Sequence, residues 1–259
     1  MKKKISKNPF FLAIDIGNTT ASLAVFKGKI IVSCKSIPTL GLSSSPKDLV
    51  SVLKHFKKQY PLLEVCLVCS VVPKALKIVT SLLRVHTRLV PLVVGRDIKV
   101  PLKSRYAKSQ IGQDRLVCAY AAKELYGAPL IVIDLGTAMT CDVISPQGVY
   151  EGGVIIPGLR LSAESLFSKT ALLPNVSIER PQELIGRTTK ASILSGIFFG
   201  YGALLDGLVM RIEQQEKMKA KVILTGGHAR LMHGFMQKKV DHVNATLVFE
   251  GLRLLSRRF

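Results

Sequence analysis

The sequence contains the same strand-and-turn pattern twice. The first copy reads FLAIDIGNTTASLAVFKG and the second reads LIVIDLGTAMTCDVISPQG. In each copy an apolar run ends in Asp-x-Gly and a threonine-rich turn, and a second apolar run and a glycine turn follow. The two aspartates, Asp15 and Asp134, are 119 residues apart (134 − 15). A repeat of this length predicts two similar halves, 1–110 and 111–259.

The rest of the chain alternates between strand-like and helix-like segments, which is typical of an α/β protein. Besides the two repeats, short apolar runs predict strands at 65–71 and 89–94. Helical apolar spacing, proline at a first turn and glycine stops predict helices along both halves. These are 46–60, a helix after Pro73, about 110–126, a helix from Leu159, about 189–217, a helix after the strand KVILTGG and a short C-terminal helix.

Both repeated turns have the chemistry of a phosphate-binding site. Gly17 and Gly136 let the backbone approach a ligand closely. Turn N–H groups and threonine hydroxyls can donate to phosphate oxygens. Those hydroxyls belong to Thr19, Thr20, Thr137 and Thr140. Asp15 and Asp134 repel phosphate, so they become useful if a cation lies between, because hard cations take oxygen ligands. One copy alone would be an ordinary hairpin with an Asx-type turn; two copies favour a nucleotide site.

Two other segments are candidates for contact with ligands. The turn Thr225–Gly227 ends an apolar strand and is a candidate for contact with the adenosine of a nucleotide. The segment IGQDR, 111–115, places Asp114 in the opening turns of a predicted helix. The helix dipole alone explains an acid there. A kinase also needs a carboxylate to accept the hydroxyl proton of its acceptor, and Arg115 suits an acceptor that carries a carboxylate.

The composition excludes several classes of protein. With 259 residues, 48% of them hydrophobic and 21% charged, the chain can bury a sizeable core. Its 37 Lys+Arg against 17 Asp+Glu give a net charge of +20, which favours anionic partners, although the basic residues are scattered. The apolar stretch before Asp15 is too short for a signal peptide, and no run of about 18 apolar residues predicts a membrane span. The five cysteines, including Cys66 and Cys69, are predicted to be reduced thiols of a cytoplasmic protein.

The order of several motifs resembles the type III pantothenate kinases, of the acetate/sugar kinase–Hsp70–actin superfamily. The motifs are DIGNT, GQDR, DLGTAMT, GGVIIPG, LLP, GRTT and TGG. The first Asp-x-Gly element is shared across the superfamily, whereas GxDR followed by DxGTA is far more specific. The resemblance covers nearly the whole chain beyond the first ten residues. It implies an α/β fold of two duplicated ribonuclease H-like domains with mixed sheets, the actin-like ATPase fold, with a nucleotide cleft between the domains.

The resemblance also implies an activity, the ATP-dependent phosphorylation of pantothenate to 4'-phosphopantothenate, the first step of coenzyme A biosynthesis. It implies a homodimer with shared active sites that uses Mg²⁺ with ATP and a monovalent cation, K⁺ or NH₄⁺. Asp114 would accept the proton, Asp15 would orient Mg²⁺ and Asp134 would bind the monovalent cation. The implied ATP-binding residues are Asp15, Ile16, Gly17, Asn18, Thr19, Thr20, Ala21, Ser22 and Thr137. The implied pantothenate-binding residues are Tyr106, Gly112, Gln113, Asp114, Arg115 and, from the partner subunit, Thr189.

Two other functions stay open at the level of the sequence. A transcription accessory or nucleic-acid-binding protein on the same fold would suit the basic charge and would bind DNA with strong salt dependence. Against it, no predicted helix concentrates base-reading Arg, Asn and Gln, and no helix-turn-helix pattern stands out. A kinase for a sugar or another small hydroxylated carboxylate would keep Asp15, Asp134 and TGG, but it gives no reason for GQDR.

Overall fold

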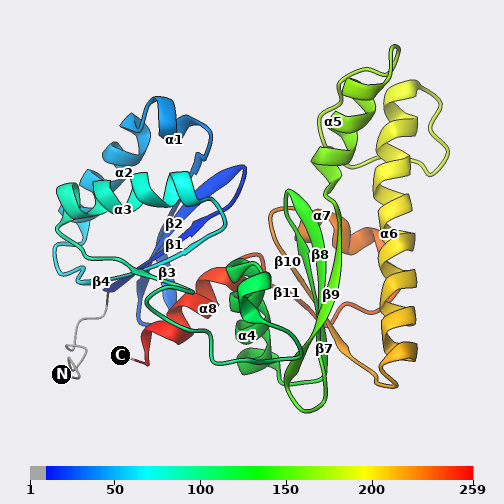
Figure 1. The fold of residues 1–259 in the computed structure, drawn as a ribbon. Coiled ribbons are helices and arrows are strands. Elements are labelled where there is room, and N and C mark those ends of the chain that lie inside the picture. Colours follow the sequence, from blue (N-terminus) through cyan, green and yellow to red (C-terminus); the bar gives the residue numbers. More distant parts are fainter. Residues whose placement is uncertain (1–9, 259) are drawn as a thin grey trace. The chain divides into compact units, whose positions relative to one another are not determined.

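The computed structural model describes residues 10–258 (Figure 1). Within these residues the chain forms two compact units, each with its own sheet. The first unit contains 10–101, 107–121 and 248–258, and the second contains 102–106 and 122–247. This division by contacts differs from the predicted halves, 1–110 and 111–259, because residues 111–121 and the C-terminal segment join the first unit and residues 102–106 join the second. Residues 1–9, with which the first predicted half begins, lie outside the described residues.

The first unit is built on a five-stranded sheet in the order β3-β2-β1-β4-β5. The strands are β1 (Phe10–Ile16), β2 (Thr20–Lys27), β3 (Ile30–Pro38), β4 (Val65–Ser70) and β5 (Leu92–Val93). β1 pairs antiparallel with β2 and parallel with β4, so the sheet is mixed. The predicted strand over 89–94 is confirmed only at Leu92–Val93.

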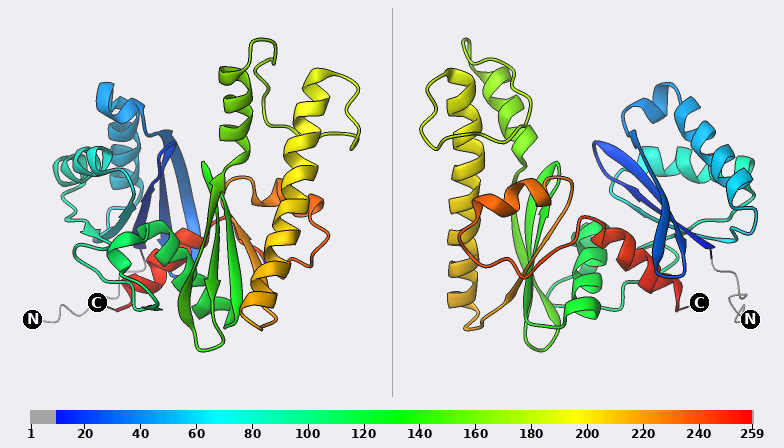
Figure 2. Two further views of the ribbon diagram at one scale, coloured as in Figure 1. Left: turned by 45° about the vertical axis from the view of Figure 1, so that its right-hand side comes forward. Right: turned by 180° about the vertical axis from the view of Figure 1, so that it is seen from behind.

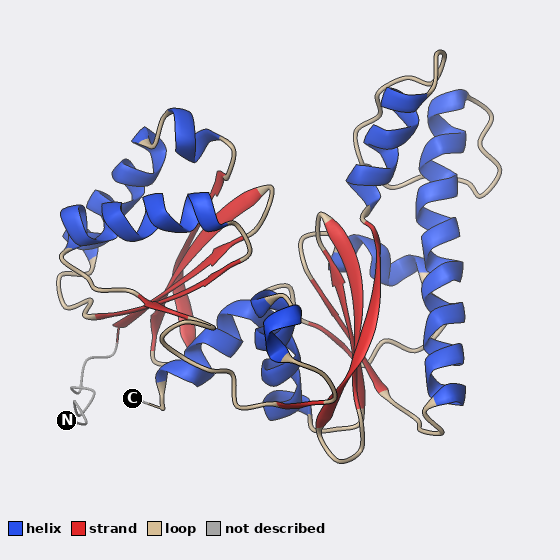
Figure 3. Ribbon diagram, viewed as in Figure 1, coloured by secondary structure: helices blue, strands red, loops and turns tan. Residues whose placement is uncertain are grey.

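Helices α2 (Lys47–Gln59) and α3 (Pro73–Thr87) cover one face of this sheet (Figure 3). Their buried residues, such as Leu53 and Val79, pack with Leu12, Ile14 and Ile16 of β1 in one core. Alternate residues of a strand point to opposite faces, so Ala13 and Asp15 lie on the other face of the sheet. The remaining helices with residues in this unit are α1 (Gly41–Ser44), η1 (Lys108–Gln110), α4 (Gln113–Tyr126) and α8 (Leu247–Ser256).

The second unit repeats the first strand by strand. Its strands are β6 (Lys103–Ser104), β7 (Leu130–Leu135), β8 (Ala138–Ile144), β9 (Val149–Pro157), β10 (Lys221–Thr225) and β11 (His242–Val243). The order β9-β8-β7-β10-β11 matches β3-β2-β1-β4-β5 in position and in strand direction. Among the strands of residues 10–258, only β6, which pairs with the outer edge of β9, has no counterpart. The duplicated α/β fold with mixed sheets is therefore confirmed.

The helices of the second unit are α5 (Leu159–Lys169), α6 (Thr189–Gln215), α7 (Ala229–Met232) and η2 (His233–Phe235). α5 and α6 lie side by side, as both views of Figure 2 show, and Ser162 of α5 shares a 2.5 Å hydrogen bond with Tyr201 of α6. One side of α6, including Phe198 and Leu205, is buried in the core under the sheet.

Among the described residues, α6 alone is long and apolar enough to cross a membrane by length and composition. Its most apolar stretch is 44% buried inside the protein. A core helix of a globular protein passes the same test, and the packing of α6 in the second unit is that of a core helix.

Candidate active site

The first Asp-x-Gly turn joins β1 to β2. Gly17 donates its N–H to the carbonyl of Thr20 at 2.9 Å, which closes the turn. Thr39, the residue after β3, supports it from one side: its hydroxyl donates to the carbonyl of Gly17 at 2.8 Å, and its N–H donates to the carbonyl of Thr19 at 2.9 Å. Asn18, Thr19 and Thr20 are exposed. The turn therefore exposes its polar side chains, while the hydrogen bonds of Thr39 fix its backbone.

Asp15 lies at the end of β1, beside the buried Cys69 of β4, with which it is in register. Burial raises the pKa of the Cys69 thiol, and the negative charges of Asp15 and Asp114 raise it further. Both carboxylates are therefore near the same thiol, on one side of the first sheet. Asp15 and Asp114 come from motifs that are far apart in the sequence, and the first unit brings them together.

Asp114 lies in the first turn of α4 and folds back over Gly112. Its Oδ1 accepts the N–H of Arg115 at 2.8 Å. A Cβ atom at Gly112 would come within 2.5 Å of the same oxygen, so glycine there makes room for the carboxylate. Burial raises the pKa of Asp114 above its ordinary value, although the Arg115 amide and guanidinium oppose the shift. A partly desolvated carboxylate with a raised pKa is a better proton acceptor than an exposed one.

Gln113 completes the motif by packing on another glycine. A Cβ atom at Gly95 would lie 2.8 Å from Cδ of Gln113, and Gly95 has a φ of +87°, which favours glycine. The motif residues Gly112, Gln113, Asp114 and Arg115 therefore form one cluster, fixed at the beginning of α4 by close contacts that only glycines permit.

The second Asp-x-Gly turn joins β7 to β8 and is supported in the same way. Gly158, the residue after β9, donates its N–H to the carbonyl of Thr137 at 3.0 Å. A Cβ atom there would lie 2.3 Å from the carbonyl oxygen of Gly136. Gly158 and Thr39 are 119 residues apart (158 − 39), and each follows the proline that ends a third strand. Both supporting residues were missed from the sequence, although this repeated spacing after proline could have found them.

The predicted third turn lies against the second. Gly226 has a φ of +87°, and a Cβ atom on it would lie 2.3 Å from Oδ1 of Asp134. The carboxylate of Asp134 therefore fills the space that this glycine leaves. The backbone N–H of His228 donates to the carbonyl of Leu135 at 3.2 Å. Burial lowers the pKa of the His228 side chain, and the positive charge of Arg160 lowers it further. Asp134 and the TGG turn are thus parts of one cluster.

The two clusters differ from a preformed metal site. Within residues 10–258 no three His, Cys, Asp or Glu side chains come together as metal ligands. Single carboxylates fit ions that take most of their ligands from elsewhere, as Mg²⁺ does when it is bound by one or two carboxylates together with substrate phosphates. Asp15 beside its polar turn has this character. Asp134, an oxygen donor held beside the backbone of a glycine turn, fits an oxygen-preferring cation.

The remaining predicted residues belong to the second unit. Tyr106 follows β6, its ring centroid lies 6.1 Å from that of Tyr150, and its side chain is 38% exposed. Thr189 is exposed at the first position of α6, where Thr188 caps the helix by accepting the N–H of Ala191. The cluster at Asp114 belongs to the first unit.

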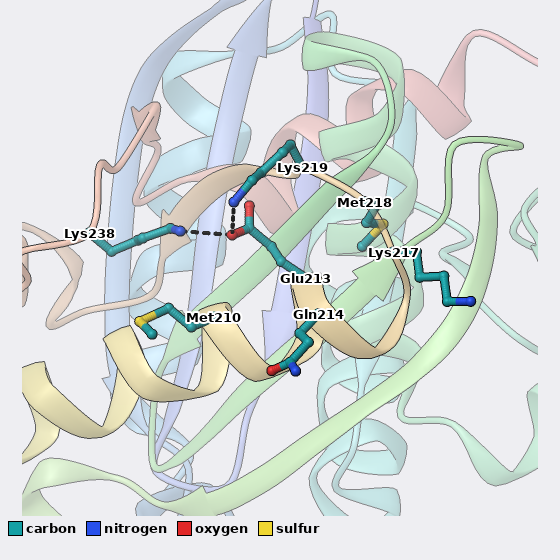
Figure 4. Close-up of a pocket in the computed structure, with 7 residues that line it drawn as sticks. All are labelled: Met210, Glu213, Gln214, Lys217, Met218, Lys219 and Lys238. Carbon is teal, nitrogen blue, oxygen red and sulfur yellow. Dashed lines mark hydrogen bonds and ion pairs between the residues drawn. The ribbon is translucent and has the colours of Figure 1, made fainter.

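A pocket at the C-terminal end of α6 is a different kind of site (Figure 4). Glu213 is almost fully buried and accepts hydrogen bonds from Lys238 at 2.7 Å, the backbone of Ala220 at 3.1 Å and Lys219 at 3.4 Å. Burial works to raise the pKa of Glu213, but these three hydrogen bonds outweigh it and hold the pKa below its ordinary value. None of the predicted site residues lines this pocket, and its ion pairs fix the connection from α6 to β10.

Comparison with solved structures gives the class of the protein. A protein from Campylobacter jejuni described as a Baf family transcriptional activator superposes with a TM-score of 0.58 at 18% identity, over 95% of this chain and 98% of its own. A polyphosphate/ATP-glucomannokinase from Arthrobacter sp. strain KM superposes with a TM-score of 0.52 at 15% identity, over 97% and 100%. At these identities the likeness shows the fold alone. Together with the two duplicated sheets, it confirms the predicted actin-like α/β fold.

Comparison of sequences gives the family. The family model described as type III pantothenate kinase matches residues 11–211. A type III pantothenate kinase of Persephonella marina is 40% identical over 93% of this chain and 96% of its own length. Another, of Halalkalibacterium halodurans, is 34% identical over 95% and 98%. The chain belongs to the type III pantothenate kinase family, which makes it a kinase of coenzyme A biosynthesis.

Proposed function

We propose that this chain transfers the γ-phosphoryl group of ATP to the primary hydroxyl of pantothenate, with Asp114 as the proton acceptor. The observation that carries the proposal is that the charges of both Asp114 and Asp15 act on the buried thiol of Cys69, with which Asp15 is in register. The first carboxylate belongs to the motif specific to the family and the second to the phosphate turn. A base and a phosphate-binding element in the same unit are what phosphoryl transfer to an alcohol requires.

Asp114 is suited to its role by its environment. Its raised pKa and its position over Gly112 keep one carboxylate partly desolvated at the beginning of α4. As the hydroxyl oxygen attacks phosphorus, its proton passes to this carboxylate, and the bond from phosphorus to the leaving oxygen of ADP breaks. Arg115 is the candidate partner for the carboxylate of pantothenate.

Both Asp-x-Gly turns would contribute to the binding of ATP. Residues 15–22 and Thr137 would bind its phosphates through backbone N–H groups and hydroxyls, with Asp15 orienting Mg²⁺. Bound Mg²⁺ neutralises charge that develops on the phosphate oxygens. Asp134, held against the TGG turn, would bind K⁺ or NH₄⁺.

We also propose that the protein is a homodimer that pairs through α5 and α6. An apolar groove between these helices is lined by residues including Leu161, Leu166, Ile193 and Gly196. The outer side of α6 also exposes Leu204 and other apolar or small side chains. An apolar surface of this kind is typical of contacts between subunits. Thr189 lines the same groove, which supports its predicted role as a contact from the partner subunit.

A panel of acceptors tests the function. Purified protein is incubated with Mg-ATP and, separately, pantothenate, glucose, N-acetylglucosamine and glycerate, each in Na⁺ buffer with and without added K⁺. We expect phosphate transfer to pantothenate alone, with a rate that rises steeply on addition of K⁺. Transfer to a sugar instead would reject the acceptor, and equal rates with and without K⁺ would reject the role of Asp134. Asp15→Asn should nearly abolish turnover without unfolding the protein.

A further inference from the structure

The strand that distinguishes the two units leads directly to Tyr106. β6 consists of only Lys103 and Ser104, which pair with Val149 and Tyr150 at the edge of the second sheet. Residues 102–106 belong to the second unit, whereas the segments before and after them belong to the first. A two-residue strand contributes few ladder hydrogen bonds, so other contacts are needed to fix this segment.

A duplicated β-bulge supplies one of them. The pairing register skips Val32 in β3 and Glu151 in β9, and these positions are again 119 residues apart (151 − 32). A bulge leaves one residue outside the ladder and changes the direction of its side chain. In the first unit the bulged residue is apolar and 41% exposed. In the second unit it is an acid that faces the extra strand.

Glu151 forms an ion pair with the residue before Tyr106. Its Oε2 accepts Nε of Arg105 at 2.5 Å, and its side chain is 12% exposed, against 72% for the arginine. The N–H of Arg105 also donates to the carbonyl of Tyr150 at 3.0 Å. Burial works to raise the pKa of Glu151, but hydrogen bonds from Arg105 and Ser145 hold it below its ordinary value, so the acid is charged at neutral pH. The backbone on the N-terminal side of Tyr106 is thereby held at two points.

The ring of Tyr106 rests on a rigid surface. Cε1 of Tyr106 lies 3.7 Å from the place of a Cβ on Gly152, whose φ of +138° favours glycine. The ring of Tyr150 beside it is fully buried, and its hydroxyl donates to Asp142 at 2.6 Å. The same carboxylate accepts the hydroxyl of Thr140 at 3.0 Å. Buried networks with their hydrogen bonds satisfied are rigid, so this surface is fixed before any ligand arrives.

We propose that Glu151 is a positioning residue for pantothenate: through Arg105 it fixes Tyr106 in the orientation that contacts the substrate. The proposal rests on the proposed function, because Tyr106 is assigned to pantothenate there. Correct placement of a binding side chain affects the affinity for its own ligand and leaves the other substrate unaffected. The bulge is thus a duplicated feature whose second copy has become part of the site.

Steady-state kinetics of Glu151→Gln test the proposal. We expect KM for pantothenate to rise about two- to fivefold, the range that one exposed ion pair supports, with kcat and KM for ATP unchanged. Tyr106→Ala alone should raise KM for pantothenate more. Adding Glu151→Gln to Tyr106→Ala should then have no further effect, because the two residues act through one contact. Lys239→Gln is the control, since it removes the ion pair of Lys239 with Asp241 at 3.3 Å elsewhere in the same unit.

Three results would overturn the proposal. They are an unchanged KM for pantothenate in Glu151→Gln, an equal rise in both KM values, and additive effects in the double variant. Hydrogen exchange separates this failure from failure of the proposed function. The amide of Arg105 should exchange faster in Glu151→Gln than in the wild type whatever the substrate is. If wild-type protein does not phosphorylate pantothenate, the function is wrong; if this amide is equally protected in both proteins, the ion pair does not hold the segment.

Discussion

At the scale of single residues, the carboxylates proposed for the site lie in different surroundings. Asp114 is partly desolvated and folded over Gly112, whereas Asp134 fits against Gly226 in a turn of another sheet. The same type of side chain is suited to accept a proton at position 114 and to bind a cation at position 134. Glycines decide both positions, because each carboxylate occupies space that a Cβ would fill.

Asp114→Asn separates catalysis from helix stabilisation. If Asp114 accepts the hydroxyl proton, kcat should fall by about 10²–10⁴-fold, with ATP binding close to wild type. An acid that only serves the helix dipole would cost about 0.3–1 kcal/mol of stability when replaced and leave kcat nearly unchanged. Single-turnover kinetics and nucleotide titration measure the two effects. A folded variant with near-normal kcat would return Asp114 to a structural role.

The raised pKa of Asp114 adds a pH dependence of known sign. Because the folded state binds this proton more tightly than the unfolded state, stability falls as pH rises from the unfolded pKa, about 3.9, through the folded pKa. Asp114→Asn should therefore be at least as stable as wild type at pH 7. The rate of the wild-type enzyme should fall on acidification through the raised pKa. Thermal melts at several pH values check the sign, and a clear loss of stability at pH 7 would contradict it.

Gly158→Ala tests the support of the second turn. The new Cβ would meet the backbone carbonyls of Gly136 and Thr137, which cannot move as a flexible side chain would. We expect overpacking strain to lower the free energy of unfolding by about 1–3 kcal/mol, and the melting temperature with it. We also expect weaker activation by K⁺, because the turn that carries Asp134 must shift. Gly41→Ala is the control, since nothing lies within 4 Å of its Cβ. Equal melting temperatures for the two variants would show that the turn adapts.

At the scale of elements, sequence patterns predicted what is local and periodic. Apolar spacing predicted a helix over 46–60, and α2 spans Lys47–Gln59; the long helix expected from 189 is α6. The hairpin turns and the repeat were equally visible. β6 was not, because two residues carry no periodicity and its pairing depends on a partner far away in the sequence. The same holds for the candidate site: its motif residues can be named from the sequence, whereas the supports Thr39, Gly158 and Glu151 act through contacts between distant segments.

The connection from α6 to β10 depends on one buried acid. Glu213→Gln should destabilise the protein by about 1–3 kcal/mol, since it weakens three hydrogen bonds and leaves the partly buried Lys238 without its counter-charge. Because the folded pKa is lowered, the contribution of Glu213 is present above its unfolded pKa, about 4.3, and is lost as pH falls through the folded pKa. Urea unfolding at pH 7 and at pH 3 should show a smaller deficit at pH 3 than at pH 7. Glu216→Gln, at an exposed position nearby, should unfold like wild type at both.

At the scale of the whole molecule, a net charge of +20 suits an enzyme whose ligands are anionic, because a positive surface raises the rate at which they are captured. The proposed pairing through α5 and α6 would also give the exposed apolar side of α6 a partner. Because two subunits with a net charge of +20 each repel one another, the contact between them would have to be stabilised by burial of this apolar area.

Gly196→Arg tests the pairing surface. Nothing lies within 4 Å of a Cβ at Gly196, so the subunit should fold normally, while the charged side chain enters the groove. We expect sedimentation to show dimers for wild type and monomers for the variant, with the loss of activity that shared sites imply. Val85→Arg, on the exposed side of α3, should remain dimeric. Monomeric wild type, or a dimeric Gly196→Arg, would place the contact elsewhere or remove it.

The C-terminal helix α8 belongs to the first unit, although every residue between 122 and 247 belongs to the second. It packs on α4 so closely that a Cβ at Gly251 would lie 2.5 Å from Cγ1 of Val117, and Leu252 and Leu255 are fully buried. A ribosome releases the N-terminal sheet long before it reaches these residues. The first unit therefore stays incomplete until the whole stretch 122–247 and then α8 have been synthesised and α8 has left the exit tunnel. For this chain the first unit to be synthesised is the last that can be finished.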